Sequence, residues 1–164
     1  MNRKVLLPVM VLLVLFAVAP VLAAPAVKMP YTANVSLVIT DPGESWTTRG
    51  DILQVRGLIA IGTFNSADLG IVDATMWKTL DYTLNTNTGK GTMHGKFVLT
   101  VDGAGTFEGS FRDKITDSTH LAGTVVGQGT GAFAGWKTMG IWYGDIIDGT
   151  VENVLEAIIL MPQA

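Results

Sequence analysis

Histidine is the side chain best suited to proton transfer and metal binding near neutral pH, and the chain has only two, His94 and His120. They lie far apart in the sequence, and neither belongs to an H-E-x-x-H motif. The sequence also lacks the G-x-S-x-G motif of serine hydrolases and the phosphate-binding P-loop. A zinc site or a serine triad would require a histidine to converge with carboxylates from elsewhere in the chain. We therefore expect neither a metal ion nor a cofactor.

Asp145 and Asp148 are the carboxylates whose spacing most resembles an acid–base pair. Each of them stands beside a glycine, in Gly144-Asp145 and in Asp148-Gly149. Asp and Gly together are typical of turns, because both tolerate the backbone angles that turns need. We favour a turn at these positions, and the sequence assigns no catalytic residue.

Large apolar side chains are the third kind of candidate, because they could line a cavity for a small apolar ligand. These candidates are Trp77, Met93, Phe107, Phe111, Phe133 and Trp136. The simpler interpretation is that they fill the core. Trp142 and Tyr143 are adjacent, so in a strand one of them should lie on the outer surface, for example at an oligomer contact.

The elements that must position these side chains are marked by a glycine pattern that occurs three times. The pattern is G-x-G-[TA]-[MF]-x-G, at residues 89–95, 103–109 and 129–135. All of its fixed positions have the same parity, so in an extended chain they share one face of a sheet. On a helix they would scatter around the axis, so the pattern predicts three β-strands.

The two faces of these strands differ in chemistry. In the first two copies the odd positions carry glycine, Met93, Phe107 and Phe111, whereas the even positions carry polar side chains such as His94 and Glu108. The odd face should therefore point inward, where glycines leave room for rings from neighbouring strands and let the sheet close. In the third copy the same parity would bury Lys137, and a bulge near Gly135 would instead turn Trp136 inward.

The whole chain alternates in the same way. Asp41-Pro-Gly43 and residues 85–89 predict turns. The segments 71–78 and 151–160 could also form helix, but strand is favoured in both. The expected strands are residues 34–40, 53–64 (through Leu53, Val55, Gly57, Ile59 and Ile61, with a kink at Gly57), 74–84, 91–101, 106–113, 120–128, 130–143 and 151–160. About eight strands with frequent turns predict an all-β fold, a single antiparallel, closed, eight-stranded barrel.

The N-terminus has the pattern of a signal peptide. Arg3 and Lys4 precede a Leu/Val-rich segment, and small residues around Ala23 suit signal peptidase. We expect residues 1–23 to be removed, residues 24–31 to form a linker or arm, and residues 32–164 to form the barrel domain of a secreted or extracytoplasmic protein. The alternative is an uncleaved membrane anchor.

Composition narrows the classes of partner and site. The chain contains no cysteine, which excludes disulfides, zinc–thiolate sites and cysteine nucleophiles. It has 14 acidic and 11 basic residues, and a cleaved leader would remove two of the basic ones. Nucleic acids and anionic lipids need a basic surface, so we expect neither nucleic acid nor, after cleavage, a membrane as partner.

Residues 82–85, 88–91, 105–109 and 127–135 resemble the glycine-patterned strands of the allene oxide cyclase and dirigent barrels. The resemblance covers about residues 75–140 and is a pattern of strands, without a residue-by-residue match to catalytic positions. It implies a secreted eight-stranded barrel, often oligomeric, with a hydrophobic interior. Members of that group guide the cyclisation or coupling of reactive apolar intermediates by shaping the cavity.

Three functions follow as expectations. The first is a secreted, non-enzymatic barrel that binds a small apolar ligand or serves a structural role. The second is a cyclase or isomerase that acts by confining its substrate. The third is a subunit of an extracellular assembly, a homo-oligomer in which the N-terminal arm or residues 151–161 pair with a neighbour's sheet edge. The first two would require an interior void of at least about 300 Å³, and a barrel packed solid by Met93, Phe107, Phe111 and Phe133 would exclude both.

Overall fold

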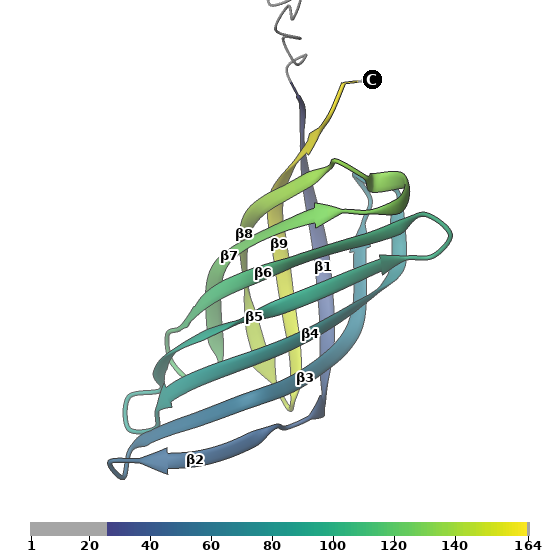
Figure 1. Cartoon of the computed structure of the whole chain (residues 1–164). Coiled ribbons are helices and arrows are strands. Elements are labelled where there is room, and N and C mark those ends of the chain that lie inside the picture. The colour runs from purple at the N-terminus through teal and green to yellow at the C-terminus, as the bar shows by residue number, and fades with distance from the viewer. Residues whose placement is uncertain (1–25, 164) are drawn as a thin grey trace, which may run out of the picture.

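The computed structural model describes residues 26–163, which form a closed antiparallel β-barrel with one additional strand (Figure 1). The elements are β1 (Val27–Asp41), β2 (Glu44–Thr48), β3 (Ile52–Ser66), β4 (Ile71–Asn85), β5 (Lys90–Val101), β6 (Gly105–Ile115), β7 (His120–Gly129), the 3₁₀ turn η1 (Gly131–Phe133), β8 (Lys137–Ile147) and β9 (Thr150–Met161). From β3 to β9 each strand pairs with the next, and β1 closes the barrel by pairing with both β9 and β3. The predicted eight-stranded barrel is confirmed, and β2 is a short extra strand on the edge of β3.

The hairpins form where the sequence supplies turn chemistry. In the β4–β5 loop, Asn85 Oδ1 accepts hydrogen bonds from the backbone N–H groups of Asn87 and Thr88, and Gly89 takes a φ of 66°. Before β2, Asp41 Oδ1 accepts a hydrogen bond from the N–H of Gly43. Asx turns of this kind reverse the chain without help from distant residues, so both turns could be predicted locally.

Strands β5 and β6 place their side chains as the glycine pattern predicts. Met93, Phe107 and Phe111 are buried, whereas His94 and Glu108 are exposed on the outer face. The polar face therefore meets solvent and the odd face builds the inner wall.

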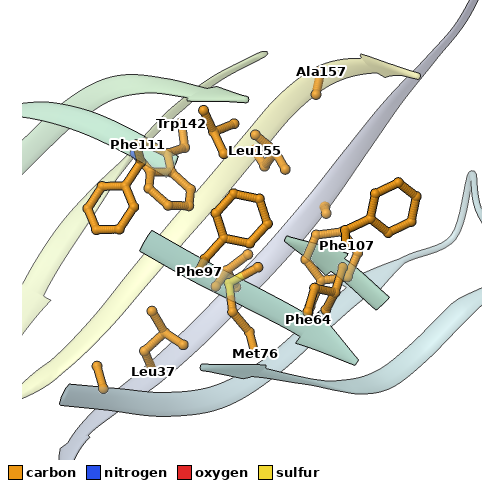
Figure 2. Packing of buried hydrophobic residues seen from close by; sticks show 14 of the residues in the cluster. Leu37, Phe64, Met76, Phe97, Phe107, Phe111, Trp142, Leu155 and Ala157 are labelled. Carbon is orange, nitrogen blue, oxygen red and sulfur yellow. The ribbon is translucent and has the colours of Figure 1, made fainter. Parts of the chain in front are cut away.

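The glycines of β6 and β7 make room for a single ring. A Cβ atom added to Gly109 would lie 2.6 Å from Cε1 of Phe97, and one added to Gly127 would lie 2.9 Å from Cζ of the same ring. Phe97 thus lies against two bare backbones in the middle of the barrel, close to Met76 (Figure 2). The pattern acts first as a packing device.

The inward face predicted for β3 is wrong beyond Gly57. The residue has a φ of 68°, and the pairing of β3 with β4 shifts register between Val55 and Leu58. This bulge turns Leu58 and Ala60 inward, so Ile59 and Ile61 do not share a face with Val55 as their spacing suggested. A kink was expected, but a bulge also exchanges the two faces of the strand that follows it.

The third glycine copy is not a strand, contrary to the prediction. β7 ends at Gly129, η1 follows, and β8 begins at Lys137. Gly131 and Gly135 have φ values of 62° and 83°, which end extended pairing. The N–H of Gly129 donates to the carbonyl of Trp136 across this loop. Lys137 is exposed as required, but the loop places it outside rather than a bulge within a strand.

The expected N-terminal arm is also corrected, because β1 begins at Val27 and pairs with β9 from Val27↔Met161 onward. The two terminal segments that could have joined a neighbour's sheet are therefore paired with each other. The predicted signal peptide, residues 1–23, lies outside the described residues. Across residues 26–163 there is no helix of the length and apolar character needed to cross a bilayer.

Candidate ligand-binding cavity

A cavity of about 190 Å³ occupies the half of the barrel near the β4–β5, β6–β7 and β8–β9 turns. The middle of the barrel is filled by side chains such as Phe64, Phe97 and Phe107 (Figure 2), and a smaller pocket lies at the opposite end. The residues around the cavity are mostly aliphatic or aromatic: Leu37, Ile39, Leu58, Ala60, Lys78, Leu80, Tyr82, Leu84, Met93, Phe111, Asp113, Ile115, Ser118, Leu121, Ile146, Val151 and Asn153. The void of about 190 Å³ is smaller than the roughly 300 Å³ expected above for a binder or a cyclase. That requirement holds for larger ligands and is too strict for the smallest ones, because a cavity of roughly 150 Å³ admits benzene in an engineered protein.

Three polar side chains of this lining are buried: Lys78, Asp113 and Asn153. Lys78 is only 3% exposed, and its Nζ atom lies 3.3 Å from the centroid of the Trp142 ring and 5.0 Å from that of Phe111. Among residues 26–163, no carboxylate oxygen lies within 4.0 Å of this Nζ. The ammonium group would thus be held mainly by the faces of aromatic rings, an attraction of roughly 2 kcal/mol when water is excluded.

Asp113 is held by a hydrogen bond that Trp142 donates. The Trp142 Nε1 atom lies 2.6 Å from Asp113 Oδ1, and the Trp142 ring meets Phe111 edge-on at 5.1 Å (Figure 2). Gly123 stands opposite Asp113 in the β6–β7 pairing, and a Cβ atom there would collide with the carboxylate. The sequence thus provides a fixed donor and a bare backbone for one buried acid.

Burial dominates the protonation of this pair. It lowers the pKa of Lys78 to about 7, although the negative charge of Asp113 opposes the shift. It raises the pKa of Asp113 to about 6, although the hydrogen bond from Trp142 and the charge of Lys78 oppose that shift. Both groups therefore titrate near neutral pH, which is where proton-transferring groups act best.

Asn153 presents a buried acceptor without a partner. Its Oδ1 atom has no hydrogen-bond partner among the described residues, and the residue is 4% exposed. Asn153 is opposite Gly144 in the β8–β9 pairing, and a Cβ atom on Gly144 would collide with that oxygen. An unpaired buried acceptor costs about 1–3 kcal/mol, so this oxygen lowers the stability of the fold.

The sequence-predicted cavity residues separate into three groups. Met93 and Phe111 line the 190 Å³ cavity. Phe107, Phe133 and Trp136 lie at the opposite end around a smaller pocket of about 120 Å³. Phe133 contacts Phe107 with tilted rings, centroids 4.9 Å apart, and meets Trp136 edge-on at 5.4 Å. Trp77 is half-buried on the outer face and does not line the interior, because the inward positions of β4 are its neighbours Met76 and Lys78.

The sequence interpretation missed Lys78, Asp113 and Asn153, although the signal for two of them was present. Asp113 continues the odd, inward parity of Phe107 and Phe111. Lys78 lies two residues beyond buried Met76 and two before buried Leu80. A charged residue in register with an apolar face is the signature that would have found them.

The histidines and the aspartate pair do not form a shared site. His94 Nε2 lies 3.9 Å from Asp81, on the outer face. His120 Nδ1 lies 2.7 Å from Asp117 and Nε2 lies 3.2 Å from Asp145, and all three side chains are exposed. Asp148 is a turn residue with a φ of 49°, as predicted. The turn predicted at Asp145 is wrong, because this residue lies within β8 and pairs with His120 of β7. In the described part of the chain, no three His, Asp or Glu side chains are placed to hold a metal ion.

The free energy of unfolding should pass through a minimum near pH 6–7 on account of Lys78 and Asp113. Between pH 3.8 and about 6 the folded chain holds the Asp113 proton that the unfolded chain has released, so stability falls as pH rises. Between about 7 and 10.5 the unfolded chain holds a Lys78 proton that the folded chain lacks, so stability rises with pH. Each slope can reach about 1.4 kcal/mol per pH unit. Urea unfolding from pH 4 to 10 measures this dependence. The free energy of unfolding of the double variant Lys78→Met/Asp113→Leu should exceed that of the wild type by the largest amount near pH 6–7. A difference that does not change with pH would contradict this assignment.

His120 should titrate above its ordinary pKa. The hydrogen bond and charge of Asp117, and then the charge of Asp145, raise the pKa of the imidazole above 6.5. The contribution of these contacts to the stability of the fold is complete below pH 6.5 and is lost as pH rises through the raised pKa of His120. NMR titration of the imidazole should show a lower pKa in Asp117→Asn, with little change in Asp148→Asn as the matched control. Equal effects of the two substitutions would count against the contact.

Comparison of the chain with protein-family models and with curated proteins finds no match. The functional argument therefore depends on the barrel and the cavity themselves.

Proposed function

We propose that this protein is a barrel that binds a small, mainly apolar molecule in the 190 Å³ cavity. The observation that supports the proposal most directly is the composition of that cavity, a largely apolar wall with three buried polar side chains. Ligand sites have this composition, because apolar walls supply affinity and a few polar groups fix orientation. The size limits the ligand to molecules somewhat larger than benzene.

Filling the cavity tests the proposal. Ala60 is 1% exposed and lines the void, so Ala60→Leu should occupy part of it. We expect toluene and benzyl alcohol to bind the wild type in NMR titrations and to bind Ala60→Leu at least about tenfold more weakly, since about 1.4 kcal/mol corresponds to a factor of ten. Ala122→Leu, on the exposed face of β7, is the matched control and should bind as the wild type does. Failure of both probes to bind the folded wild type would overturn the proposal.

An isomerase or cyclase that acts by confinement is the second candidate. The observation that favours it is the pair Lys78 and Asp113, two ionisable groups at the cavity wall with pKa values near neutrality. This activity is also what the resemblance to the allene oxide cyclase barrels implies. The test is to incubate the protein with a small apolar compound that binds it and to identify the compound recovered afterwards. A rearranged product that disappears in Lys78→Met would support catalysis, and unchanged recovery would support simple binding.

Export belongs to the same proposal. The basic, apolar and small-residue segments at the N-terminus support secretion with cleavage near Ala23. N-terminal sequencing of the protein from the extracytoplasmic fraction tests this. A chain that retains Met1 in the membrane fraction would contradict it.

A further inference from the structure

We infer that Lys78 reacts reversibly with small apolar aldehydes and ketones in the cavity, forming an imine through its Nζ atom. The inference rests on the proposed ligand-binding function and names the chemical class of the ligand. It depends on two features of the site: the isolation of the amine and the position of Asp113 at the wall of the same cavity.

The amine is placed as a nucleophile rather than as a structural cation. Buried lysines in protein cores usually have a carboxylate partner, because an unpaired buried charge is costly. Lys78 lies at the cavity wall, in the middle of β4, with aromatic rings on one side and no ion-pair partner within 4.0 Å among the described residues. Such a site favours the neutral amine, whose lone pair is free to attack a carbonyl carbon.

Asp113 can supply the proton that imine formation requires. Its Oδ1 atom is occupied by the hydrogen bond from Trp142, and the residue lines the same cavity as Lys78. Burial favours the protonated carboxyl, which is the form able to donate. The Nζ atom and this carboxyl are more than 4.0 Å apart, and both residues line the one cavity in which a carbonyl compound would bind.

The steps balance without an oxidant or reductant. The Nζ lone pair attacks the carbonyl carbon, a C–N bond forms, and the oxygen receives the proton that nitrogen gives up, which yields a neutral carbinolamine. Asp113 then protonates the hydroxyl, water leaves, and the remaining N–H proton returns to the carboxylate. The products are one imine and one water molecule.

The cavity size limits the carbonyl compound. A void of about 190 Å³ with apolar walls accommodates benzaldehyde or a short-chain aldehyde, and the packed half of the barrel prevents a long chain from passing further in. Hydrophilic aldehydes such as sugars would lose their hydration without replacement hydrogen bonds. Small apolar carbonyl compounds are therefore the expected class.

Reductive trapping tests the inference on the full mature chain. Benzaldehyde and cyanoborohydride at pH 7 should give a single benzyl adduct, located by peptide mass spectrometry on Lys78, at a rate at least about tenfold above that of exposed Lys96 or Lys114. Toluene has the same ring without the carbonyl, and it should protect Lys78 in the wild type. Lys78→Met should lose the adduct, and Ala60→Leu should reduce labelling.

The outcomes separate the inference from the proposed function. Toluene binding without an adduct on Lys78 would overturn the imine and leave ligand binding standing. Even labelling of all lysines, or labelling of Lys78 that toluene does not reduce, would also overturn the imine. No binding of toluene would overturn the proposed function itself. The protection experiment uses only the wild type, so it decides the matter even if Lys78→Met fails to fold.

Discussion

Replacing Asp113 with alanine is expected to lower the free energy of unfolding by about 3 kcal/mol at pH 7. The substitution removes the acceptor of the Trp142 Nε1 hydrogen bond, which leaves a buried donor unsatisfied, and it removes the negative charge that favours the Lys78 ammonium. Deprotonation of Lys78 limits the second cost, because the amine can become neutral near pH 7. Urea denaturation measures the change.

Two companion variants identify the source of that loss. Asp113→Asn keeps an oxygen acceptor for Trp142 without the charge, so it should lose clearly less stability than Asp113→Ala. Adding Lys78→Met to Asp113→Asn should recover stability, because it removes the amine that has lost its counter-charge. A loss of less than about 0.5 kcal/mol for Asp113→Ala would show that this carboxyl is not buried as described.

Valine at Gly109 should prevent the barrel from folding, or cost about 3 kcal/mol or more. A Cβ atom at this position collides with the backbone carbonyl of Val126 and comes within 2.6 Å of the Phe97 ring, and backbone pairing leaves neither group room to move. Ser110→Val, one position along on the exposed face of β6, is the matched control and should leave stability nearly unchanged. Soluble yield and thermal unfolding measure both.

Gly127 provides a sharper version of the same experiment. A Cβ atom there meets mainly the tip of the Phe97 ring at 2.9 Å and a methyl group of Thr138 at 3.1 Å, with the nearest backbone atom 3.2 Å away. Gly127→Ala should therefore destabilise the barrel, and the second substitution Phe97→Leu should partly restore it. The same second substitution should not rescue Gly109→Ala, because the collision there is with backbone. Equal rescue at both positions would show that Phe97 does not lie against the two glycines as described.

Local chemistry and parity explain why much of the barrel could be predicted. The alternation of Met93, Phe107 and Phe111 with polar neighbours identifies an inner face, and Asn85 and Gly89 identify a hairpin, because side-chain direction and turn geometry depend on residues close in sequence. The strand predicted over residues 151–160, whose two glutamates also allowed a helix, is confirmed as β9. Trp142 is buried and Tyr143 is 44% exposed, as adjacent strand residues should be.

The predictions fail where contacts between residues far apart in the sequence determine the local structure. The third glycine copy has nearly the same residues as the second, yet its Thr130 and Ala132 donate to the carbonyls of Thr106 and Ala104 and so hold a turn against β6. One residue inserted at Gly57 reverses the faces of the rest of β3, which alternation alone cannot reveal. The polar part of the cavity lining is missed for another reason: lysine and aspartate are normally surface residues, and only the closed barrel brings Lys78 and Asp113 to one void.

The pairing of β1 with both β9 and β3 has a consequence for how the chain folds. Every pairing from β3 to β9 is a hairpin between consecutive strands and can form as soon as its second strand is available. The β1–β9 seam joins the two ends of the described chain, and Tyr31 of β1 is hydrogen-bonded to Thr138 of β8 in the same region. Closing so long a loop costs conformational entropy before the contacts of the seam can form and offset that cost. Formation of this seam should therefore set the folding rate. Until β9 has been synthesised and docked, the chain is an open sheet with an exposed apolar face, and this is the interval in which it would be most prone to aggregate.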